Sequence, residues 1–98
     1  MATRQDVYVA INTERAYQAK RWSEDTTKSG GKHETSAFLT YMREYLRRAE
    51  VLASSRGDGT PAPEGAEFAG ESALDFVRKV TALGVACMEQ NGAPKRQL

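Results

Sequence analysis

The stretch LDFVRKVTALGVACM, residues 74–88, decides the fold because it holds the longest apolar run in the chain. At helical spacing it forms two neighbouring seams. One seam holds Leu74, Val77, Thr81, Gly84 and Met88, and the other holds Phe76, Val80, Leu83 and Cys87. A helix that is apolar around most of its circumference is covered from more than one side. We therefore expect it to pack within its own chain and also against a partner, most simply a second copy in a homo-oligomer.

Two further helices are predicted before this stretch. Residues 35–55 carry an unbroken apolar stripe at three- and four-residue steps, made of Phe38, Leu39, Met42, Tyr45, Leu46, Ala49, Leu52 and Ala53. Residues 4–22 show similar spacing, but VYVAI at 7–11 also has β propensity, so residues 5–11 are either helix or strand. With a third helix over about residues 71–91, the pattern predicts an all-α, three-helix domain.

The segments between these helices, residues 23–33 and 56–70, lack any period and are rich in Gly, Pro and small polar residues. They are predicted to be flexible loops. The 98 residues then make a single helical domain, residues 1–98. Thr35 or Ser36 is the expected N-cap of the second helix, and Asn91 followed by Gly92 marks the expected end of the third.

Composition argues against several classes of protein. Lys and Arg number 14 against 13 Asp and Glu, a formal net charge of +1, so no stable nucleic-acid complex is expected. The single cysteine, Cys87, excludes an intrachain disulfide. Neither a secretory signal nor an apolar stretch of membrane length is found, so we expect a cytoplasmic protein that does not associate with membranes.

Metal-dependent hydrolysis is the first functional hypothesis. All-α, MazG-like nucleotide pyrophosphohydrolases hold magnesium between carboxylate pairs on two helices, and Glu71 with Asp75 matches one such pair. Glu44 and Glu50, six residues apart, lie on different sides of a helix and do not match the other pair. His33 has no nucleophile placed near it by any recognisable motif. No catalytic residue, metal ligand or cofactor is assigned, and the pattern favours a protein that is not an enzyme.

A binding site for a nucleotide is the second hypothesis. Such a site combines cations for phosphate, an aromatic face for the base and a carboxylate or amide for the base edge. The first helix carries this set within two turns, as Glu14, Arg15, Tyr17, Gln18, Arg21 and Trp22. Further cations expected to contact phosphate across a helix or subunit boundary are Arg43, Arg47, Arg78 and Lys79. Ordinary core packing of the aromatics and a solvated arginine face are the alternative interpretation.

The segments INTERAYQAKRW, FLTYMREYLRRAE and ALDFVRKVTALGVACMEQNGAPKR resemble a family of small bacteriophage and prophage proteins. Members of this family carry Asp/Glu-Arg-Ala-Tyr-Gln followed by Trp, then a Trp/Phe-Leu-Thr-Tyr helix, then a closing Val-Ala-Cys-Met/Leu-Glu-Gln segment. The resemblance covers about three fifths of the chain and leaves both loops out. The matching positions are Glu14, Arg15, Tyr17, Gln18, Trp22, Leu39, Tyr41, Tyr45, Leu46, Ala49, Leu74, Arg78, Lys79, Cys87, Glu89, Gln90 and Gly92.

This resemblance implies a phage protein that acts in the cytoplasm of the infected host cell. A small, non-catalytic oligomer of phage origin suggests an anti-defence sponge, which sequesters the cyclic nucleotide signal of an immune system of the CBASS or Thoeris type. The expected partner is accordingly a cyclic nucleotide or another phosphorylated small molecule. The alternatives are the hydrolase considered above and an inhibitor that binds a host protein through a helix face.

Overall fold

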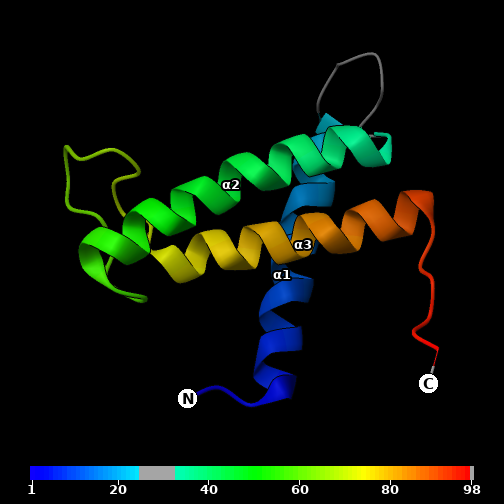
Figure 1. The fold of residues 1–98 in the computed structure, drawn as a ribbon, viewed down its shortest axis with the longest axis horizontal. Coiled ribbons are helices and arrows are strands. Elements are labelled where there is room, and N and C mark those ends of the chain that lie inside the picture. The colour runs from blue at the N-terminus through cyan, green and yellow to red at the C-terminus, as the bar shows by residue number, and fades with distance from the viewer. Residues whose placement is uncertain (25–32, 98) are drawn as a thin grey trace.

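The computed structural model describes residues 1–24 and 33–97 and contains three helices, labelled in Figure 1 as α1 (Arg4–Glu24), α2 (Thr35–Arg56) and α3 (Ala73–Asn91). Within those ranges there is no strand, and an isolated bridge joins Ala62 and Ala69. The predicted all-α, three-helix fold is confirmed, and residues 5–11 are helical. Most of the predicted loop 23–33 lies outside the described residues.

α2 and α3 lie side by side and antiparallel, as a helical hairpin (Figure 1). Their core is a cluster of Phe38, Leu83 and Ala86 together with a second cluster of Ala49, Leu52, Ala62, Ala73 and Phe76. The α3 seam that includes Phe76 and Leu83 is therefore buried inside the chain. The seam that includes Leu74, Val77 and Met88 stays about half exposed.

The segment between α2 and α3 closes one end of this core. Ala62 is buried within it, and the ring of Phe68 packs edge-on against Phe76 at a centroid distance of 5.5 Å. The guanidinium of Arg48 lies over both rings, 5.1 Å from the centroid of Phe68 and 5.8 Å from that of Phe76. Part of the predicted loop 56–70 thus contributes apolar contacts to the hairpin.

A capping box starts α3. The hydroxyl of Ser72 accepts from the backbone N–H of Asp75, and the Asp75 carboxylate accepts from the backbone N–H of Ser72 at 2.8 Å. Burial opposes the charge on Asp75, but hydrogen bonds from Ser72 and from Arg78 outweigh it and hold the pKa of this carboxyl below its ordinary value. At the other end, the N–H of Gly92 donates to Met88, which agrees with the predicted stop.

The start of α2 differs from expectation. Glu34, rather than Thr35 or Ser36, occupies the N-cap position, and its side chain makes no capping hydrogen bond. The helix starts one residue earlier because the backbone N–H groups of Ala37 and Phe38 donate to the carbonyl of Glu34. This end of α2 therefore lacks the side-chain cap that α3 has.

α1 crosses the hairpin at a steep angle, and its N-terminal half projects beyond α3 (Figure 1). The half that packs is the polar one, because Glu14 and Gln18 are each only 8% exposed. Val7, Tyr8 and Val9 are about half exposed, so the apolar start of this helix does not bury as its spacing indicates. Among the described residues, no helix is long and apolar enough to span a bilayer.

Replacement of Asp75 by Asn is predicted to lower the free energy of unfolding by about 1 kcal/mol at pH 7, because it weakens the cap of α3. A carboxyl whose folded pKa is lowered stabilises the fold above its ordinary pKa, and this contribution disappears as pH falls through the folded value. The difference between wild type and Asp75→Asn should therefore shrink below about pH 4. Urea unfolding monitored by circular dichroism at several pH values measures it.

Asp58→Asn is the matched control, because Asp58 is exposed and lies outside the helices. It should leave stability at pH 7 within about 0.5 kcal/mol of wild type. An equal loss in both variants, or a loss in Asp75→Asn that does not change with pH, would contradict the assigned cap.

Candidate functional site

A pocket of about 540 Å³ lies where α1 crosses the hairpin. We call it the α1–α3 pocket. It is lined by Glu14, Tyr17, Gln18, Arg21 and Trp22 of α1, Tyr45 of α2 and Lys79 of α3. A second hollow, of about 560 Å³, shares Glu14, Tyr17 and Lys79 with it and extends to Ala10, Thr13, Glu71 and Arg78. Because they share three lining residues, the two hollows adjoin each other along the packed half of α1, and we call them together the groove.

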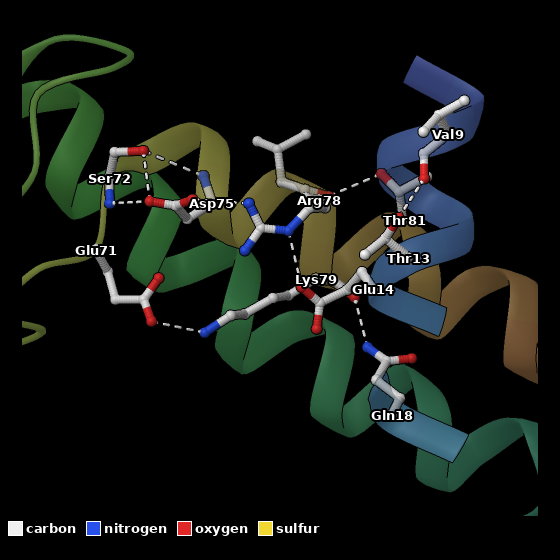
Figure 2. A network of polar contacts seen from close by, with 11 residues as sticks. Val9, Thr13, Glu14, Gln18, Glu71, Ser72, Asp75, Arg78, Lys79 and Thr81 are labelled. Atoms are coloured by element: carbon white, nitrogen blue, oxygen red, sulfur yellow. Dashed lines mark hydrogen bonds and ion pairs between the residues drawn. The ribbon is translucent and has the colours of Figure 1, made fainter. Parts of the chain in front are cut away.

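Polar contacts hold α1 against α3 beside this groove, as Figure 2 shows. The Nε of Arg78 donates to Glu14 at 2.8 Å, and its Nη1 donates to Asp75 at 2.7 Å. The side-chain amide of Gln18 donates through Nε2 to the backbone carbonyl of Lys79 at 3.3 Å. Beside the apolar packing of Trp22 on the hairpin core, charge and hydrogen bonding thus join α1 to α3.

The pair of Glu14 and Arg78 is a partly enclosed ion pair within this contact. Glu14 retains 8% of its side-chain exposure and Arg78 retains 33%. A carboxylate removed from water to this extent is costly unless a cation neutralises it. The hydrogen bond to Glu14 is also the largest influence on Arg78 and raises the pKa of its guanidinium above its ordinary value. The Arg78 guanidinium therefore stays charged at every physiological pH.

Gln18 lines the pocket and carries an unpaired acceptor. Its Nε2 is used by the Lys79 carbonyl, and its Oε1 is buried with no hydrogen-bond partner among the described residues. Buried amide oxygens nearly always have a donor, and leaving one unpaired costs about 1–3 kcal/mol. Because this oxygen has almost no accessible surface, a donor group in the pocket pairs with it only after the amide turns toward the pocket.

Aromatic rings and cations surround this acceptor. Trp22 is held by Phe38 at a ring distance of 5.9 Å, so its position is set by the hairpin core. Tyr17 is 56% exposed and receives a hydrogen bond from Arg21 through its hydroxyl. The ammonium of Lys79 pairs with Glu71 at 2.8 Å. The pocket thus has flat aromatic faces and two cations, Arg21 and Lys79, of which Lys79 is held by its ion pair with Glu71.

The structure brings six of the ten predicted site residues together in the α1–α3 pocket, namely Glu14, Tyr17, Gln18, Arg21, Trp22 and Lys79. Arg78 lines the adjoining hollow. Three arginines lie outside both hollows. Arg15 pairs with Glu89 and covers Trp22, Arg47 pairs with Glu44 at 3.1 Å, and Arg43 is exposed on α2.

Four lining residues of the two hollows are outside the predicted set, namely Tyr45, Ala10, Thr13 and Glu71. Tyr45 was expected to belong only to the buried stripe of α2, yet it is half-buried and also faces the pocket. A polar hydroxyl on an otherwise apolar stripe is the one signal in the sequence that indicated this. Glu71 was considered as a metal ligand, but it pairs with Lys79, and Asp75 caps α3. In the part of the chain that the structure describes, no three His, Cys, Asp or Glu side chains gather as metal ligands.

Removal of one member of the enclosed pair is predicted to destabilise the protein. Arg78→Met leaves the Glu14 carboxylate without its cation and should lower the free energy of unfolding by about 2 kcal/mol. The double variant Glu14→Gln with Arg78→Met should lose at least about 1 kcal/mol less than the sum of the single losses. Urea denaturation of the four proteins gives this coupling energy.

Arg47→Met serves as the control, because Arg47 and Glu44 form an exposed pair on one helix. Its effect should stay within about 0.5 kcal/mol. Additive single losses at Glu14 and Arg78 would show that the pair does not hold α1 in place.

Comparison with models of known protein families, with curated proteins and with solved structures finds no match to this chain. The functional interpretation therefore depends on the pocket itself.

Proposed function

We propose that the α1–α3 pocket binds a nucleotide, of the cyclic kind used as an immune signal by bacteria, and sequesters it without altering it. The observation that carries this proposal is the buried, unpaired Oε1 of Gln18 in a pocket lined by aromatic rings and cations. The exocyclic amino group of a nucleobase is the kind of donor that such an oxygen accepts from. A volume of about 540 Å³ falls in the range of pockets for compact ligands.

The other lining residues supply the remaining recognition chemistry. Trp22, Tyr17 and Tyr45 offer faces on which a base can stack, which contributes about 1–3 kcal/mol per base in proteins that bind single strands. Arg21 and Lys79 supply donors for phosphate oxygens. Arg21 is exposed and bonded only to Tyr17 among the described residues, so its guanidinium can turn to a ligand at low cost.

Binding without turnover fits the state of the carboxylates around the pocket. Glu14, the carboxylate that lines it, is neutralised by Arg78, and Glu71 in the adjoining hollow is neutralised by Lys79. A general base or magnesium ligand has to leave such a partner before it acts. Sequestration requires only affinity, and it suits the resemblance to small phage proteins that act in the cytoplasm of an infected cell.

Ligand depletion tests the proposal. The purified chain is incubated with each member of a panel of cyclic di- and trinucleotides and cyclic ADP-ribose isomers. The free ligand is then measured, the protein is heat-denatured, and the released ligand is analysed by chromatography and mass spectrometry. We expect depletion of at least one compound and its release intact. An altered product would indicate a hydrolase, and no depletion of any compound would contradict the proposal.

Variants locate the site. Arg21→Ala and Gln18→Leu should each weaken depletion about tenfold or more, because they remove a charged donor and the buried acceptor. Arg43→Ala is the matched control, since Arg43 is an exposed arginine outside the pocket. Equal binding by Arg21→Ala, Gln18→Leu and Arg43→Ala would place the ligand elsewhere.

A further inference from the structure

The α2–α3 hairpin has an apolar face that α1 does not cover, which we call the open face. It carries Leu39 and Leu46 of α2 and Leu74, Val77 and Met88 of α3, each between 44% and 56% exposed. Between them the two helices approach closely, because a Cβ on Gly84 would lie 3.6 Å from the Met42 methyl. On α3 these residues occupy a different face from Arg78 and Glu89, which contact α1.

The chain is also more open than its mass predicts. Its accessible surface is 7378 Å², whereas a compact monomer of 10.8 kDa exposes about 5,500 Å². Its radius of gyration is 14.7 Å, against about 12.6 Å for a compact domain of this length. Part of this excess lies on the projecting half of α1, and part lies on the open face.

We propose that the open face is the interface of a symmetric homodimer in which each helix of the hairpin packs antiparallel to its own copy. A twofold axis that lies between the two open faces and passes over the middle of both helices gives this arrangement. The same surface of each copy then forms the interface, which makes it isologous. In this arrangement each helix runs opposite to its copy. The residues before its centre therefore have to fit the residues after the centre of the same helix in the partner. Both helices meet this requirement.

On α2 the spacing is symmetric about Leu46. Leu39 and Ala53 stand seven residues to either side of it, so Leu39 faces the partner's Ala53 when Leu46 meets its own copy. Arg43 and Glu50 flank the same stripe, and the antiparallel register places Arg43 of one chain beside the partner's Glu50. Both side chains are exposed, with no ion pair to another described residue. A second copy therefore supplies the charge that each one lacks.

On α3 the spacing is symmetric about Thr81. Leu74 and Met88 stand seven residues to either side of it, and no charged side chain interrupts this stripe. The two centres also lie at the same level of the hairpin. Counting along the antiparallel helices from the contact of Met42 with Gly84 places Leu46 beside Val80, the residue before Thr81. A single twofold axis therefore passes over the centres of both helices. Binding of an unrelated protein would not require the two centres to lie at the same level.

The size of the open face suits such a dimer. α2 has 22 residues and α3 has 19, so each is about 30 Å long. Two helices of this length about 10 Å apart present roughly 600 Å² or more, close to one partner's share of a specific interface. The α1–α3 pocket of each copy stays outside the interface. The dimer does not depend on the proposed ligand.

Sedimentation velocity over a concentration series from about 1 to 100 µM tests the dimer. Wild type should sediment as a dimer, with dissociation constants in the range of standard interfaces, about micromolar or tighter. Leu46→Glu and Val77→Glu should each weaken it at least a hundredfold, since a charge would be buried unpaired. Val51→Glu is the matched control, because Val51 is 44% exposed on another face of α2, and it should remain dimeric. Circular dichroism verifies that all three variants stay helical.

A charge exchange tests the register. Arg43→Glu and Glu50→Arg alone should each weaken the dimer about tenfold, because two attractive pairs become repulsive. An equimolar mixture of the two single variants should form heterodimers of wild-type affinity, since every pair is then opposite in charge. A monomeric wild type at all concentrations would overturn the dimer, whether or not another protein binds the face. A mixture no tighter than the single variants would overturn the antiparallel register.

Discussion

The ion pair between Glu14 and Arg78 is the contact on which the position of α1 depends. It joins a helix that starts the chain to one that ends it, and it lies beside the groove that α1 makes with the hairpin. Apolar side chains would hold two helices together in several relative positions, because apolar contacts do not require one particular partner residue. A buried carboxylate requires its cation, so this contact selects one position of α1 along α3 and rejects neighbouring ones.

The α2–α3 hairpin and α1 therefore contribute differently to the protein. The α2–α3 hairpin contains the apolar core, with Phe38, Leu83 and Ala86 packed at its centre. α1 adds little to that core apart from Trp22, and in exchange its polar half lines a pocket. Contacts of this kind open at lower free energy than a hydrophobic core. A site between a stable hairpin and a less firmly held helix is able to admit and enclose a ligand.

The sequence predicts the two helices of the hairpin well, because the α2 stripe and the apolar run of α3 follow helical spacing without interruption. It also places Glu14, Gln18 and Lys79 in one candidate site, because Glu14 and Gln18 are polar residues on the inner stripe of a helix and Lys79 is a cation available for phosphate. The side of α1 that packs is predicted poorly. Apolar Val7 suggests burial, but α1 crosses α3 in its second half, around Glu14 and Gln18, and a crossing point depends on the angle between helices rather than on spacing. Tyr45 was missed for a related reason, because a stripe residue at the edge of a hairpin can serve core and pocket together.

Hydrogen exchange of the backbone amides tests most directly whether the Glu14–Arg78 contact holds α1 on the hairpin. In wild type, the amides of α1 around residues 12–20 should be protected well above the level of an isolated helix, which is marginal at this length. In Arg78→Met, their protection should fall to that of an unpacked helix, while the amides of α2 and α3 around Phe38 and Leu83 keep theirs. Unchanged protection of α1 in Arg78→Met, or a parallel loss in all three helices, would contradict the account.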